Sequence, residues 1–183
     1  MKHERRALAV DLRATGRRLI GYAATFNTET RIGDAWRESI APGAFAASLA
    51  SGRDVLALVD HDTTRVLGRT RSGSLRLSED SRGLAFEIDL PDTQPGRDVL
   101  ALAERGDLGG MSFGFIARDE RRDGARRELR AVDLLEISVV SAWPAYPETL
   151  VQARSKHAHH PALARAELIN RINAALYLQE SRK

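Results

Sequence analysis

Four groups of residues in this sequence could carry chemistry: a serine between glycines, one interior histidine, a carboxylate in an apolar segment and three histidines near the end. The serine is Ser112, in the run Gly110-Met111-Ser112-Phe113-Gly114, which has the Gly-x-Ser-x-Gly spacing of a nucleophile elbow. That spacing alone is weak, because an elbow needs a strand before the serine and a helix after it. A glycine-rich turn precedes Ser112 and a strand-like segment follows it, so a hairpin serine flanked by turn glycines is the other interpretation.

The interior histidine is His61, which follows a continuous apolar run at residues 55–59 and lies between Asp60 and Asp62. One interpretation is a surface turn in which an aspartate caps the loop. The other is a general base at the end of a buried strand, with its charge tuned by the neighbouring acids. The remaining histidines are His3 in the charged N-terminal segment and three near the C-terminus, so a histidine base inside a structured core would have to be His61.

The carboxylate is Glu136, in the strand-like segment 133–140, where apolar residues lie on both sides of it. An ionised carboxylate buried there costs several kcal/mol unless it is paired, so a histidine or arginine partner is required. An ordinary ion pair with one of the many arginines is as consistent with this as a catalytic role. Asp133 lies three residues earlier, and strand alternation predicts that it points to the opposite face.

Three histidines near the C-terminus, His157, His159 and His160, could in principle bind a metal. They have no acidic or cysteine companions, so a solvated basic run is the better interpretation. The sequence contains no cysteine, which excludes disulfides, thiol catalysis and cysteine-ligated zinc. We expect no metal and no cofactor.

The pattern of apolar residues predicts a mainly β protein with peripheral helices, an α+β class. Helices are predicted at 42–50 and 96–105, and strands at 8–12, 18–26, 55–59, 75–77, 84–90, 111–118 and 126–140. The strands are too closely spaced for successive βαβ units, so a closed or nearly closed antiparallel β-barrel fits best. We expect one domain over 1–153, a basic linker at 154–161 and a helical appendage at 162–183.

The composition is that of a folded, water-soluble chain: 183 residues with a net charge of +3 and 43% hydrophobic residues. No apolar run approaches the length of a membrane span, and no secretory signal is evident. The positive charge lies at both ends, since residues 1–18 and 154–183 each hold six basic and two acidic side chains. With 5% aromatic residues and no basic–aromatic interleaving, we expect no direct binding to nucleic acid or membrane.

Several short motifs, taken in order, resemble the prohead (capsid maturation) proteases of tailed bacteriophages. The motifs are Gly21-Tyr22-Ala23, residues 40–45 (Ile-Ala-Pro-Gly-Ala-Phe), Val59-Asp60-His61-Asp62, Leu67-Gly68-Arg69, Gly83-Leu84, residues 110–115, residues 135–140 and Pro144-Ala145-Tyr146-Pro147. The resemblance spans about residues 19–150, nearly the whole expected domain. Gene transfer agents carry similar enzymes and are not distinguished by these motifs.

This resemblance implies a serine endopeptidase related in fold to the herpesvirus assembly proteases. It implies His61 as the base, Ser112 as the nucleophile and Glu136 as the third member. The backbone amides near Phe113 and Gly114, or the side chain of Arg69, are candidates for the oxyanion hole.

The resemblance also implies partners and a place of action. The substrates would be a separate scaffold protein or the major capsid protein with its scaffold-like arm, and self-cleavage would also occur, with copies of itself as a further candidate partner. Cleavage would take place inside the assembling prohead in the host cytoplasm, and the enzyme would be absent from the mature particle.

Two alternatives remain at this stage. The first is an α/β-hydrolase-like esterase that uses Ser112, Asp133 and His157. The second is a non-catalytic head-assembly protein that retains the barrel.

Overall fold

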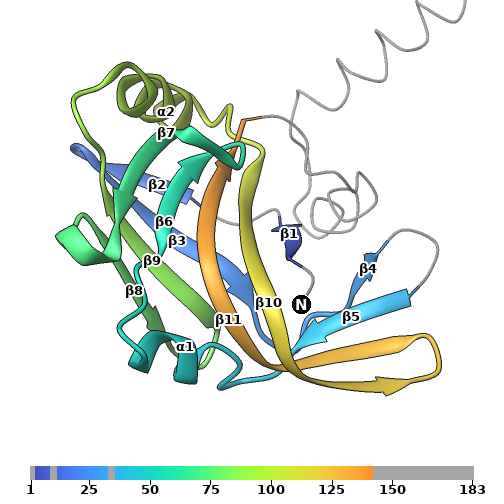
Figure 1. Cartoon of the computed structure of the whole chain (residues 1–183). Helices are drawn as coiled ribbons and strands as arrows, with labels where there is room; N and C mark the ends of the chain where they lie inside the picture. The colour runs from blue at the N-terminus through green and yellow to red at the C-terminus, as the bar shows by residue number, and fades with distance from the viewer. Residues whose placement is uncertain (1–2, 9–11, 33–35, 142–183) are drawn as a thin grey trace, which may run out of the picture. The chain divides into compact units, whose positions relative to one another are not determined.

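The computed structural model describes residues 3–8, 12–32 and 36–141 (Figure 1). Its helices are α1 (Ala46–Ala50) and α2 (Gln94–Arg105), with a 3₁₀ turn at Thr70–Ser72. Its strands are β1 (Glu4–Leu8), β2 (Leu12–Thr15), β3 (Arg18–Thr25), β4 (Thr30–Ile32), β5 (Trp36–Ile40), β6 (Leu56–Val59), β7 (Asp62–Arg69), β8 (Leu75–Glu79), β9 (Gly83–Asp89), β10 (Gly110–Asp123) and β11 (Arg126–Val140). In this part of the chain no helix is both long and apolar enough to cross a membrane.

The strands form two sheets. The seven-stranded sheet is built around the long β10–β11 hairpin, with β1 on the free side of β10. On its other side β11 pairs with β5 along its first residues and with β6 along its last ones, both in parallel. The four-stranded sheet has the order β2-β3-β9-β8 and is antiparallel throughout. Figure 1 shows β10 and β11 curving over the smaller sheet.

The core lies between these sheets because the main strands of both, such as β9 and β10, have one apolar face. Along β10, Met111, Phe113 and Phe115 alternate with Ser112 and Gly114, and the three apolar side chains are fully buried. They join residues such as Leu19, Phe86 and Ile88 from the four-stranded sheet in one cluster. The same alternation places Ser112 and Gly114 on the opposite face of β10. Core packing therefore fixes which face of the hairpin can carry a site.

A β-bulge interrupts the hairpin next to this apolar row. Gly114 lies opposite Glu136 and Phe115 opposite Leu134, so the register skips Leu135. The amide of Leu134 is then satisfied from outside the ladder, because it donates to Ser48 Oγ of α1 at 2.9 Å.

The structure confirms the mainly β class, both predicted helices and the strands around residues 18–25, 56–59, 75–79 and 83–89. The centre of the strand expected at 8–12 lies outside the described residues, with β1 ending at Leu8 and β2 beginning at Leu12. Strands β4, β5 and β7 were not expected, because these segments are short or polar and lack clear alternation.

The expected antiparallel barrel differs from the observed pairing, which leaves two sheets and includes two parallel contacts of β11. The reason is the length of β11: its fifteen residues span two different neighbours on one edge. The linker at 154–161 and the helix at 162–183 lie outside the described residues.

Candidate active site

His61 lies at the tip of the tight turn that joins β6 to β7. Asp60 and His61 both have a left-handed backbone, with φ of 50° and 62°, and Val59 pairs with Asp62 across the turn. This is the backbone of a two-residue hairpin turn of type I′, which Asn-Gly usually forms and a histidine adopts at a cost. The turn is fixed to the end of β11, since the Asp60 amide donates to the Val139 carbonyl at 2.9 Å. The Asp60 carboxylate also accepts bonds from the Ser141 amide (2.8 Å) and hydroxyl (2.9 Å).

Glu136 lies on β11 with its side chain on the face opposite the core. It is 5% exposed, and its carboxylate has two close hydrogen-bond partners among the described residues. His61 Nδ1 donates to Oε1 at 2.6 Å, and Ser138 Oγ donates to Oε2 at 2.7 Å. An ionised carboxylate only accepts hydrogen bonds, so Nδ1 is the protonated nitrogen. The partner that burial demands is thus the interior histidine.

Ser112 lies near the start of β10, directly opposite Ser138 on β11 and Ala7 on β1. Ser138 bonds to Glu136 two residues earlier on the same face, so Ser112 shares this face with the carboxylate. The Ser112 side chain is completely buried, and its Oγ has no hydrogen-bond partner among the described residues. An orphaned buried hydroxyl is uncommon and is found where a group is kept for chemistry.

These contacts bring His61 and Glu136 together and place Ser112 on the same face, without a bond from Ser112 to His61. With Nδ1 donating to Glu136, the other ring nitrogen of His61 is left as an acceptor. Such a histidine can take a proton from a serine hydroxyl while the carboxylate stabilises the cation.

Asp133 does not take part in this arrangement. The prediction that it faces away from Glu136 is wrong, because the bulge at Leu135 resets the alternation and places Asp133 opposite Ile116, on the same face as Gly114. What separates Asp133 from the site is its partners. Arg118 hydrogen bonds to it, assisted by Arg53 at 3.3 Å, and holds the pKa of the Asp133 carboxyl below its usual value.

The esterase alternative therefore loses support. Ser112 lies within a strand that continues to Asp123 and leads into strand β11 rather than into a helix. Asp133 is engaged by arginines, and His157 lies outside the described residues.

The oxyanion candidates lie in different settings. Phe113 and Gly114 belong to a strand that is paired on both sides, by β1 and by β11. Backbone amides in such a strand are used by the ladder, which counts against them as free donors. Arg69 lies at the end of β7, in register with Leu56, which in turn is in register with Glu136. Its guanidinium binds Asp54, and with five N–H groups it keeps donors beyond that pair.

Three residues near Glu136 were missed from the sequence. Ser138 could have been found, because it follows Glu136 by two positions and strand alternation puts both on one face. Arg5 and His3 could not, because only the pairing of β1 with β10 brings the N-terminal segment to the site.

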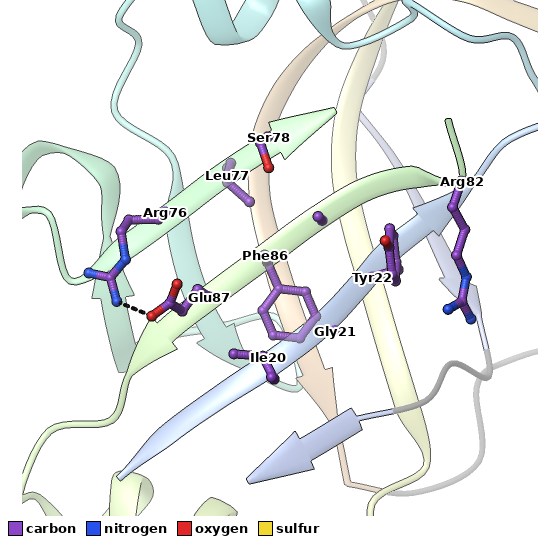
Figure 2. Close-up of a pocket in the computed structure, with 10 residues that line it drawn as sticks. Ile20, Gly21, Tyr22, Arg76, Leu77, Ser78, Arg82, Phe86 and Glu87 are labelled. Atoms are coloured by element: carbon purple, nitrogen blue, oxygen red, sulfur yellow. Dashed lines mark hydrogen bonds and ion pairs between the residues drawn. The ribbon is translucent and has the colours of Figure 1, made fainter. Parts of the chain in front are cut away.

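The pocket shown in Figure 2 lies elsewhere, on the four-stranded sheet. Its lining comes from β3, β8 and β9, with Tyr22, Arg76 and Glu87 among its residues, and includes none of the candidate site residues. Arg76 there forms an ion pair with Glu87 at 2.8 Å.

A buried serine, a histidine oriented by a carboxylate and a scaffold of β-strands define the general arrangement of a serine hydrolase. The caudovirus prohead serine protease family matches residues 4–162 of the 183, and the chain belongs to this family. It is therefore a serine peptidase. No curated protein and no solved structure shows a significant match to the chain.

Proposed function

We propose that this chain is the endopeptidase of head maturation and that His61, Ser112 and Glu136 are its catalytic triad. The observation that carries the assignment is the 2.6 Å hydrogen bond from His61 Nδ1 to Glu136, formed on the strand face that also presents Ser112. Family membership supports the activity, and this bond supports the choice of residues.

The chemistry follows from the tautomer. His61 Nε2 accepts the Ser112 proton as Oγ forms a bond to the scissile carbonyl carbon, and the carbonyl oxygen becomes an anion. The imidazolium is stabilised by Glu136 and then donates its proton to the leaving amine, which leaves an acyl-enzyme. A water molecule, deprotonated by the same nitrogen, releases the acyl group and restores Ser112. Turnover requires Ser112 Oγ to come within hydrogen-bonding distance of His61, as often happens only when substrate binds.

The developing oxyanion needs a donor that is free to bind it. We assign this role to Arg69 ahead of the amides of Phe113 and Gly114, because the latter lie in a strand paired on both sides. A closed barrel like that of the herpesvirus assembly proteases is also part of the proposal. The curvature of β10 and β11 over the four-stranded sheet supports it (Figure 1).

The substrates follow from the family. We propose that the chain cleaves a scaffold protein, or the scaffold-like arm of the major capsid protein, and cleaves itself, inside the prohead in the host cytoplasm. We further propose that it is absent from the mature particle.

The test is co-expression of the full chain with the neighbouring capsid protein, followed by intact mass measurement. The chain should shorten the capsid protein or its scaffold by a defined segment, and Ser112→Ala should abolish this while remaining folded. Ser78→Ala, an exposed serine on β8, is the matched control and should cleave normally. Normal trimming by the Ser112 variant would overturn the assignment.

A further inference from the structure

The N-terminal strand β1 is fastened to the sheet by buried charges on its inner face. Arg6 donates to Glu38 of β5 at 2.5 and 2.8 Å, and Arg127 of β11 donates to Glu38 at 2.9 Å and to Glu4 at 2.6 and 2.8 Å. Glu120 of β10 completes this cluster through Arg127. Breaking one member of such a buried set costs several kcal/mol, so β1 is held firmly beside β10.

The outer face of β1 points to the site. Arg5 pairs with Gly114 and Ala7 with Ser112, so the alternate residues of β1 lie next to the nucleophile and the carboxylate. Arg5 Nε is 3.9 Å from Glu136 Oε1, with the Arg5 side chain 52% exposed. A β-carbon at Gly114 would collide with Glu136 Oε1 and would lie 2.7 Å from His3 Nε2. The imidazole of His3 and the carboxylate of Glu136 therefore border the same point above Gly114.

We propose that β1 and the residue before it complete the active site, with Arg5 and His3 acting as positioning residues that hold the Glu136 carboxylate directed at His61 Nδ1. This inference rests on the proposed function. As positioning residues, both act through Glu136. The buried cluster of Arg6, Glu38 and Arg127 explains how a segment so close to the chain terminus can hold these groups in place.

Among the described residues, the N-terminal segment brings two side chains to Glu136: Arg5 on β1 and His3, the residue before that strand. The β6–β7 turn contributes His61, and β10 contributes Gly114, which is uncharged. Asp133 on the same face of β11 is neutralised by its arginines.

The experiment compares the full wild-type chain with Arg5→Ala, Arg5→Lys, His3→Gln and the double variant Arg5→Ala/His3→Gln. Arg105→Ala, a distant exposed arginine on α2, is the control. Activity is measured as kcat and KM on the co-expressed capsid protein. The hydrogen bond to Glu136 is followed, without substrate, by the downfield NMR signal of the His61 Nδ1 proton.

We expect Arg5→Ala to lower kcat about threefold to fivefold with KM unchanged, the size of effect of a half-exposed ion pair. The double variant should lose more and broaden the Nδ1 proton signal, and Arg5→Lys should restore most of both. Unchanged kcat and an unchanged Nδ1 signal in the double variant would overturn the inference. An inactive wild type that keeps the signal, and loses it in the double variant, would instead refute the proposed function and leave the positioning role intact.

Discussion

Two groups of buried polar residues lie on opposite faces of the same strands and differ in how completely they are satisfied. On the inner face, Arg6, Glu38 and Arg127 form a closed set in which each charge has a partner of opposite sign. On the outer face, Glu136 is satisfied by His61 and Ser138, but the hydroxyl of Ser112 is left without a partner in the described part of the chain.

This difference indicates a structural role for the inner group and a chemical role for the outer group. A fully paired cluster gains nothing from a further ligand, whereas an orphaned hydroxyl on the same face as a carboxylate that orients a histidine can still bond to one. The left-handed backbone at His61 supports a chemical role for the outer group, because such strain persists where a side chain must be held in one direction. We therefore expect substitutions in the outer group to affect cleavage and those in the inner group to affect stability.

The largest effect should come from Glu136→Gln. An amide cannot stabilise the imidazolium and can hold the wrong tautomer, and the comparable change in a serine triad lowers kcat about 10⁴-fold. Single-turnover cleavage of the capsid protein measures this, with folding checked by circular dichroism.

Asp133→Asn is the matched control for that measurement, since it is an acid on the same strand and the same face that is held by Arg53 and Arg118. We expect its rate to change less than about tenfold, a barrier change under about 1.4 kcal/mol. A dead Asp133 variant beside a normal Glu136 variant would reverse the assignment of the third triad member.

Arg127→Ala should destabilise the fold by about 3–5 kcal/mol, because it leaves Glu38 buried with half of its partners removed. Urea unfolding of the purified chain is the measurement. The neighbouring Arg126→Ala removes an exposed arginine at 70% exposure and should cost under about 1 kcal/mol. Equal losses of unfolding free energy in the two variants would show that the buried ion pairs of the inner group contribute no more stability than exposed ones.

Acidification should affect the two groups at different pH values. Cleavage should fall between about pH 7 and 5, where an imidazole base becomes protonated. The Arg127 hydrogen bond lowers the pKa of Glu4 in the folded chain to about 2. The ionised Glu4 therefore adds stability at pH values above its pKa in the unfolded chain, about 4.3, and this stability is lost as the pH falls toward 2.

The measurement compares rates with unfolding free energies of wild type and Glu4→Gln across the same pH series. The variant should be less stable by roughly 2–3 kcal/mol at pH 7, and the gap should close near pH 2. A difference in unfolding free energy that stays constant with pH would contradict the role of Glu4. A cleavage rate that stays flat from pH 8 to 5 under chemistry-limited conditions would contradict a histidine base.

The smallest effect on stability should come from Ser112→Ala in the outer group. Ser112→Ala removes a buried hydroxyl that has no described partner and should leave stability unchanged or raise it by up to about 1 kcal/mol. Ser138→Ala removes a donor to the buried Glu136 carboxylate and should lower stability by about 1.5–3 kcal/mol. Thermal or urea unfolding of both variants decides this, and a destabilised Ser112 variant would mean that its hydroxyl has a bond in solution.

Local features of the fold could be predicted from the sequence alone. The apolar alternation of residues 84–90 and the helical spacing of 96–105 predicted β9 and α2, since these patterns depend only on side-chain period. Burial of Glu136 in an apolar strand required a partner, and His61 was the one interior histidine available to it. The ordered motifs around His61, Ser112 and Glu136 were also sufficient to reveal the resemblance to the family.

Features that depend on pairing between distant segments became known only from the folded structure. The bulge at Leu135 reversed the expected facing of Asp133, because strand alternation predicts faces only while the register is unbroken. The N-terminal segment has the composition of a solvated tail, yet its charges find buried partners on β5 and β11 that lie up to 123 positions away. Such contacts leave no local pattern in the chain, which is why Arg5 and His3 at the site became visible only once β1 was paired with β10.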